Sequence, residues 1–151
     1  MNGELVSIII PAYNVDNYLE ECVNSLLCQT YTNYEIVIID DGSTDNTYNI
    51  GKQLTVESVK VKLFHQENQG VSIARNIGMQ KANGEFFIFV DADDIAAPQY
   101  IETLVACARK SDMGMAGFTS ERGEIATKVS MNTVDIRASD MMESILCGTN
   151  Y

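Results

Sequence analysis

Three carboxylates within four residues are the feature of this sequence with the clearest chemical meaning: Asp91-Ala92-Asp93-Asp94. Negative charges this close repel one another, and each carboxyl has a raised pKa unless a cation lies nearby. Carboxylate oxygens suit Mg²⁺ and Mn²⁺, which also bind phosphate oxygens and water. Asp93 or Asp94 could instead only cap a helix that begins near Pro98, but one aspartate is enough for that. The segment therefore favours a divalent-cation site at Asp91, Asp93 and Asp94.

A second acidic pair, Asp40 and Asp41, comes directly before a turn. Gly42 permits a tight turn, and the side chains of residues 43–45 could satisfy the free backbone amides of a following helix. Helix capping does not require two adjacent aspartates. We therefore expect at least one of Asp40 and Asp41 to accept a hydrogen bond from a ligand.

A third polar segment, Pro11-Ala12-Tyr13-Asn14, follows the first apolar run of the chain. Tyr13 offers a flat ring on which a nucleobase could stack. Asn14 is a good residue for capping a helix. On this segment alone, a packed aromatic ring followed by a cap explains the residues as well as a binding site does.

The elements that must position these residues alternate between strand and helix. Apolar, β-branched runs predict strands, and apolar residues at three- and four-residue spacing predict helices. Strands that are apolar on both faces favour a mostly parallel α/β sheet with helices on both faces. Ligands bind such sheets beyond the carboxyl ends of the strands, where the three polar segments should meet. We expect strands at 6–10, 35–39, 59–64 and 85–90, helices at 18–27, 45–56, 71–82 and 98–110, weaker strands at 113–118 and 124–129, and a last helix at 138–147.

Length and charge exclude several classes of protein. The 151 residues fit a single domain, 1–151, and carry 10 Lys and Arg against 21 Asp and Glu, a net charge of −11. A nucleic-acid-binding protein needs a basic face, and none is visible. A membrane-spanning helix needs roughly 18 or more consecutive apolar residues, and no such run occurs. A secretory signal peptide needs a basic start, but the first Lys or Arg is Lys52.

Cysteine usage indicates a reducing compartment. The four cysteines form no CxxC pair and have no histidine at metal-ligand spacing; they are Cys22, Cys28, Cys107 and Cys147. Each lies in an apolar or helical context, where a free cysteine behaves as a small apolar residue. We therefore expect reduced structural thiols and a cytoplasmic protein. The single histidine, His65, has no triad partner in the sequence and is expected to be structural.

Five segments, taken together and in order, resemble the motifs of family 2 glycosyltransferases, an inverting group with the Rossmann-like GT-A fold. They are residues 6–14, 25–31, 38–45, 68–78 and 90–94. The resemblance implies a nucleotide-diphosphate sugar donor, with UDP favoured, held by Mn²⁺ or Mg²⁺. It also implies transfer of the sugar to a carbohydrate or lipid-linked acceptor, with inversion. Bacterial relatives of this type commonly build cell-surface polysaccharides at the cytoplasmic face of the membrane.

The resemblance also implies roles for single residues. Tyr13 would stack near the base, Asp41 would bind its polar edge, and Asp91 and Asp93 would form a DxD-type pair, with Asp94 close enough to share either task. Arg75 could orient a carboxylate or meet phosphate charge, unless it forms only a surface ion pair. The residues assigned to nucleotide binding are Pro11, Ala12, Tyr13, Asn14, Asp40, Asp41, Arg75, Asp91, Ala92 and Asp93.

The sequence departs from the family at the catalytic base. The base is normally an Asp or Glu, often in a Glu-Asp pair, well downstream of the metal motif. The later acids form no such pair; they are Glu102, Asp112, Glu121, Glu124, Asp135, Asp140 and Glu143. We leave the catalytic residue unassigned and expect it beyond Tyr151, in a longer enzyme of which this chain is the donor-binding part with a truncated GT-A fold. A truncated sheet could also expose apolar surface and self-associate.

Two other functions remain open at this point. Without a base, the chain could be a non-catalytic nucleotide-binding module on the same fold. A signalling receiver domain also combines a parallel sheet, clustered aspartates and Mg²⁺. A receiver has its acidic pair after the first strand, where this chain has residues 11–14, and needs a lysine after the last strand, which Lys128 does not convincingly supply.

Overall fold

The computed structural model describes residues 3–109. The described residues divide into two units between Pro98 and Gln99. The strands predicted at 113–118 and 124–129, the helix predicted at 138–147 and Cys147 lie outside the described residues. No described helix has the length and apolar character needed to cross a membrane.

The elements alternate between strand and helix, as the sequence predicts. The first unit contains β1 (Val6–Ala12), α1 (Leu19–Leu27), β2 (Tyr34–Asp41), α2 (Thr47–Glu57), β3 (Val61–Gln66), α3 (Val71–Lys81) and β4 (Phe86–Phe89), and the second contains α4 (Tyr100–Ala108). The main differences are at element ends. Strand β2 runs on through Asp40 and Asp41, and Pro98 precedes α4 instead of forming its first turn.

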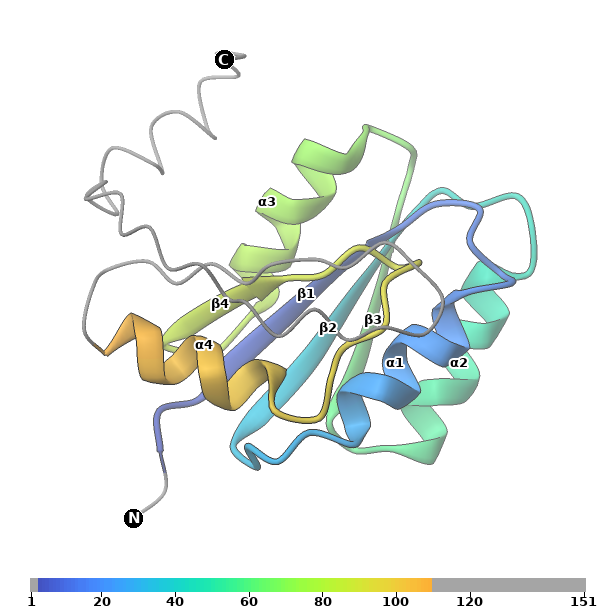
Figure 1. Cartoon of the computed structure of the whole chain (residues 1–151). Helices are drawn as coiled ribbons and strands as arrows, with labels where there is room; N and C mark the ends of the chain where they lie inside the picture. Colours follow the sequence, from blue (N-terminus) through green and yellow to red (C-terminus); the bar gives the residue numbers. More distant parts are fainter. Residues whose placement is uncertain (1–2, 110–151) are drawn as a thin grey trace. The chain divides into compact units, whose positions relative to one another are not determined.

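The four strands form a parallel sheet in the order β3-β2-β1-β4 (Figure 1). Ile8 of β1 lies opposite Ile36 of β2 on one side and Ile88 of β4 on the other. The chain adds β2 and β3 on one side of β1, then crosses back to add β4 on the other side. Ligand sites in such sheets lie where the strand order reverses, at the carboxyl ends of the strands.

Helices cover both faces of this sheet (Figure 1). Neighbouring residues of a strand point to opposite faces. On β3, Leu63 meets Gly51 of α2, whereas Phe64 packs against a cluster that includes Ala74 of α3. Helix α3 lies so close to the sheet that a Cβ atom on Gly78 would collide with the side chain of Ile9. The predicted arrangement of a parallel sheet between helices is therefore confirmed.

A buried carboxylate ties the amino ends of the strands together. Glu35 of β2 accepts hydrogen bonds from Ser7 Oγ of β1 at 2.7 Å, from Lys62 Nζ of β3 at 2.6 Å and from the backbone N–H of Asn83 at 2.6 Å. Ser7 Oγ in turn accepts a bond from the backbone N–H of Gly84, just before β4. Burial raises the pKa of Glu35, but these hydrogen bonds outweigh it and lower the pKa from 4.5 to about 2.

This depressed pKa predicts a defined acid sensitivity. Ionised Glu35 stabilises the folded state above pH 4.5, and that contribution, roughly 2–3 kcal/mol, is lost as the pH falls from 4.5 towards 2. Glu35→Gln should lower the free energy of unfolding in urea by about 2 kcal/mol at pH 7 and flatten its fall with acid. Glu57→Gln, an exposed glutamate on α2, is the control and should change little. Equal stability of the two variants at pH 7 would contradict this role.

Candidate functional site

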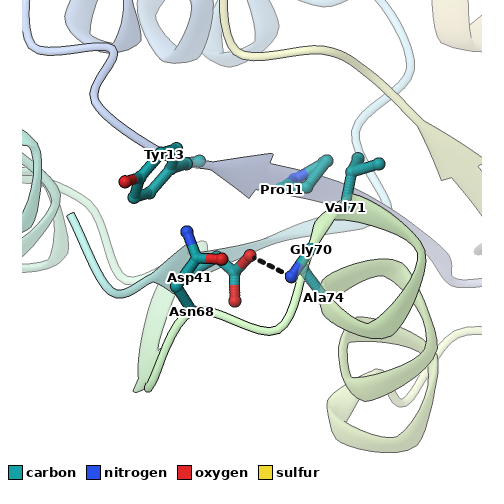
Figure 2. A pocket seen from close by; sticks show the side chains of 8 residues that line it. Pro11, Tyr13, Asp41, Asn68, Gly70, Val71 and Ala74 are labelled. Carbon is teal, nitrogen blue, oxygen red and sulfur yellow. Dashed lines mark hydrogen bonds between the residues drawn. The ribbon is translucent and has the colours of Figure 1, made fainter.

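A pocket lies at the carboxyl ends of β1 and β2, against the start of α3 (Figure 2). Its volume is about 270 Å³, and its lining residues are Pro11, Ala12, Tyr13, Asp41, Asn68, Gly70, Val71 and Ala74. In the view of Figure 2, Tyr13 and Pro11 lie on one side and Asp41 and Asn68 on the other. Tyr13 is 49% exposed, so about half of this residue is accessible to a ligand.

Asp41 forms the buried polar wall of the pocket. Its Oδ1 accepts hydrogen bonds from Gln66 Nε2 at 2.6 Å and from the backbone N–H of Gln69 at 2.9 Å, and its Oδ2 accepts one from the N–H of Gly70 at 2.8 Å. Gly70 precedes α3 and has φ +90°, a conformation that favours glycine. Because a helix N-terminus stabilises negative charge, Asp41 both lines the pocket and anchors the helix that closes it.

Asp40 lies on the opposite face of the sheet from Asp41. It is completely buried, and its Oδ2 is 2.6 Å from Nδ1 of His65 on β3. The His65 ring also makes an edge contact with Tyr48 of α2 at a centroid distance of 5.3 Å. Asp40 therefore does not line the pocket, and His65 has a hydrogen-bonded partner, as expected of a structural histidine.

The residues after β4 form a tight acidic turn. The backbone N–H of Asp94 donates to the carbonyl oxygen of Asp91 at 3.0 Å, and the side chains of Asp91 and Asp93 are exposed. Burial raises the pKa of Asp94, and the charges of Asp93 and Asp91 raise it further. Burial and the same three aspartates raise the pKa of the Cys22 thiol to about 12. The charge repulsion expected from the sequence is therefore present at Asp94.

This acidic turn can supply part of a metal site. Within residues 3–109, no three His, Cys, Asp or Glu side chains converge in a group that could hold a metal ion by themselves. Mg²⁺ commonly takes one or two carboxylates from the protein and completes its shell with water and phosphate oxygens. The exposed oxygens of Asp91 and Asp93, with the charge repulsion around Asp94, fit a cation that shares its ligands with a phosphate group.

Arg75 links α3 to the acidic turn. Its Nη2 donates to Oδ1 of Asp91 at 2.7 Å, while its Nε is buried and has no acceptor among the described residues. The side chains of Arg75 and Asp91 are 35% and 56% exposed, so this ion pair adds little to stability. Since Ala74, one residue earlier, lines the pocket, α3 connects the pocket to the acidic turn.

The structure brings together only part of the predicted site. Pro11, Ala12, Tyr13 and Asp41 share the pocket, and Arg75 meets Asp91 beside it. Ala92 is buried within the acidic turn, and Asn14 and Asp40 do not line the pocket. Four further residues line the pocket although the sequence predicts no role for them: Asn68, Gly70, Val71 and Ala74. Their segment was marked only by its motif, residues 68–78.

None of the described cysteines, Cys22, Cys28 and Cys107, forms a disulfide.

A sequence model for the family described as "Glycosyl transferase family 2" matches residues 7–137. The chain belongs to glycosyl transferase family 2. Its parallel sheet and its structural neighbours agree with the predicted Rossmann-like GT-A fold.

Bacterial relatives of this family 2 chain are named as glycosyltransferases. It is 44% identical over 111 residues to glycosyltransferase GlyG of Streptococcus pneumoniae. This match covers 73% of this chain and 37% of GlyG. It is 45% identical over 111 residues to the uncharacterized glycosyltransferase YibD of Escherichia coli, covering 74% of this chain and 32% of YibD. The chain thus spans about a third of the length of these relatives.

Solved structures that resemble this family 2 chain include two complexes with nucleotide sugars. S. aureus TarS in complex with UDP-GlcNAc has a TM-score of 0.64 and 32% identity, covering 71% of this chain and 32% of that one. The mannosyltransferase PcManGT from Pyrobaculum calidifontis, in complex with GDP-Man and Mn²⁺, has a TM-score of 0.54 and 28% identity. The match covers 60% of this chain and 28% of the PcManGT chain.

Because Asp41 accepts three hydrogen bonds, we expect an isosteric change at this residue to destabilise the folded chain. In Asp41→Asn, the new NH₂ group faces a backbone N–H or the NH₂ of Gln66, so at least one donor loses its acceptor. The free energy of unfolding in urea should fall by about 1–3 kcal/mol. Glu67→Gln, an exposed change in the loop before α3, should leave it unchanged. An Asp41→Asn variant as stable as Glu67→Gln would show that these bonds do not anchor α3.

Proposed function

We propose that this chain is the donor-binding region of a metal-dependent, inverting glycosyltransferase, which holds a nucleotide-diphosphate sugar for transfer to an acceptor hydroxyl. The observation that carries the proposal is the arrangement of the pocket and the acidic turn on one helix. Val71 and Ala74 of α3 line the pocket, and Arg75 of the same helix bonds Asp91 in the turn. A ligand with an aromatic base and a charged diphosphate suits this pair of environments.

The pocket suits the base. Tyr13 presents half of its surface and could stack on a heterocycle. An ionised carboxylate has about four acceptor positions, and Asp41 uses three of them on Gln66, Gln69 and Gly70. One position on Oδ2 therefore remains for an N–H group of a base. We favour UDP because a uracil ring has one such imide N–H and is small enough for this pocket.

The rest of the donor would extend from the pocket to the acidic turn. A volume of about 270 Å³ lies just below the usual range of ligand pockets, ~300–1,000 Å³, so the pocket would hold only part of a nucleotide sugar. Complexes of TarS with UDP-GlcNAc and of PcManGT with GDP-Man and Mn²⁺ support a nucleotide-sugar donor.

Asp91, Asp93 and Asp94 would hold Mn²⁺ or Mg²⁺ together with the diphosphate. When bound, the cation would neutralise the negative charge of the leaving diphosphate. Arg75 would keep Asp91 oriented, and its guanidinium could also meet phosphate charge. The acceptor, a carbohydrate or lipid-linked hydroxyl at the cytoplasmic side, needs a base, which we assign to none of residues 3–109.

The proposal predicts metal-dependent binding of UDP. Calorimetry should detect UDP binding to the chain with Mn²⁺ present, and Asp93→Asn should weaken it about tenfold or more, because a neutral amide is a poor ligand for a hard cation. Glu85→Gln, an exposed change just before the other end of β4, should leave the Kd unchanged. If the folded wild-type chain bound no nucleoside diphosphate with Mn²⁺ or Mg²⁺, the proposed donor site would be wrong.

A non-catalytic nucleotide-binding module is the second candidate function, because we assign no base within residues 3–109. The two functions predict the same UDP binding and differ in turnover. A glycosyltransferase containing this region should release UDP from a UDP-sugar in the presence of an acceptor, and a binding module should not. That assay, made on the natural protein that contains this region, would separate them.

A further inference from the structure

We propose that Asn14 is a positioning residue, which sets the place of the Tyr13 ring by joining the turn after β1 to the turn after β2. The inference rests on the proposed function, because it concerns how the nucleoside pocket is held ready for its base. It differs from a direct contact between Asn14 and the nucleotide.

The backbone at Asn14 is unusual. Asn14 has φ +52°, and among residues 3–109 it is the one non-glycine residue with a positive φ. Asparagine tolerates this left-handed conformation better than most residues. The turn after β2 also contains a left-handed residue, Gly42 with φ +73°. Each left-handed residue directly follows a residue that lines the pocket, Tyr13 in one case and Asp41 in the other.

Hydrogen bonds join these two turns in both directions. Asn14 Oδ1 accepts from the backbone N–H of Thr44 at 2.8 Å and from its Oγ1 at 3.3 Å. The backbone N–H of Asn14 donates to Ser43 Oγ at 3.1 Å. Asn14 thus makes three hydrogen bonds to two neighbouring residues of the other turn.

The next two residues continue the connection. The backbone N–H of Val15 donates to Thr47 Oγ1 at 2.8 Å, and that of Asp16 donates to Asp45 Oδ2 at 3.2 Å. Asp45 Oδ1 also accepts from the N–H of Thr47 at the start of α2. Three consecutive backbone amides after Tyr13 are therefore bound by side chains of the segment after Asp41.

These contacts leave Tyr13 dependent on its backbone for its place. No hydrogen bond joins the Tyr13 side chain to another described residue. On one side of Tyr13, β1 pairs with β2 as far as Ala12 opposite Asp40. On the other side, the first long-range hydrogen bonds after Tyr13 in the described part of the chain are those that begin at Asn14. The same bonds hold the turn that follows Asp41. They therefore fix the position of Tyr13, on which a base would stack, relative to Asp41, the polar wall of the pocket.

Two simpler roles for Asn14 do not agree with the structure. Its Oδ1 already accepts two hydrogen bonds, and the residue does not line the pocket. It also does not cap α1, which begins five residues later at Leu19 and has no side-chain cap. A pocket whose walls are held in place before binding spends less free energy on ordering them when the ligand arrives.

The test uses three substitutions and a double-mutant cycle. Asn14→Gly keeps the positive φ but removes Oδ1, Asn14→Asp keeps both the φ preference and an acceptor oxygen, and Asn14→Ala loses both. With Mn²⁺ present, calorimetry should show UDP binding weakened about tenfold in Asn14→Gly, at least as much in Asn14→Ala, and within about threefold of wild type in Asn14→Asp. In a Tyr13→Ala background, Asn14→Gly should change the Kd less than about twofold.

Two results would overturn this role. One is wild-type UDP affinity in Asn14→Gly, and the other is an undiminished loss in the Tyr13→Ala background, which would mean that Asn14 acts through something other than Tyr13. Ligand-free NMR of ¹³C-labelled tyrosines gives an independent reading. The Tyr13 ring signal, assigned from its absence in Tyr13→Ala, should shift or broaden in Asn14→Gly and stay in place in Asn14→Asp. If wild type bound no UDP, the proposed function would fail while this NMR comparison still decided the role of Asn14.

Discussion

Two adjacent aspartates at the end of a buried strand must both find hydrogen-bond donors, and the site is built around that requirement. Because successive strand residues face opposite sides of a sheet, Asp40 and Asp41 cannot share the same donors. Asp41 takes its donors from Gln66 and from the two backbone amides that begin α3. Asp40 pairs with His65 on the other face. The pocket exists because the Asp41 bonds bring the start of α3 against the end of β1.

The chain's carboxylates differ in how far their charges are balanced within the fold. Glu35 has donors from three segments and a pKa lowered to about 2, and Asp41 has three donors. Asp93 and Asp94 have no comparable donors within residues 3–109, and the pKa of Asp94 is raised by burial and by the charges of Asp93 and Asp91. The first two carboxylates stabilise the fold, whereas the charges of the acidic turn are balanced less fully by donors among the described residues. The net charge of −11 alone does not reveal this division.

Local patterns in the sequence were enough to predict the alternation of strands and helices and the edge of the sheet where the pocket lies. The apolar spacing along α1 and the buried runs of β1 and β2 are properties of short segments. The partner of Asp40 and the pocket wall formed by Val71 and Ala74 depend on contacts between segments far apart in the chain. The role proposed for Asn14 could not be predicted from the sequence for a further reason. Asparagine before a helix usually indicates a helix cap. Its actual partner, Thr44, is thirty residues away.

The close approach of α3 to the sheet has a consequence for how variants of this chain should be interpreted. Gly78 lies within a regular helix, so its backbone would accept most other residues, and glycine is needed there because the side chain of Ile9 leaves no space for a Cβ atom. A larger residue would push the helix outwards and carry the pocket wall at its other end with it. A screen for lost function would then identify a position one turn of helix beyond the pocket residue Ala74, and its defect could be mistaken for a missing ligand contact.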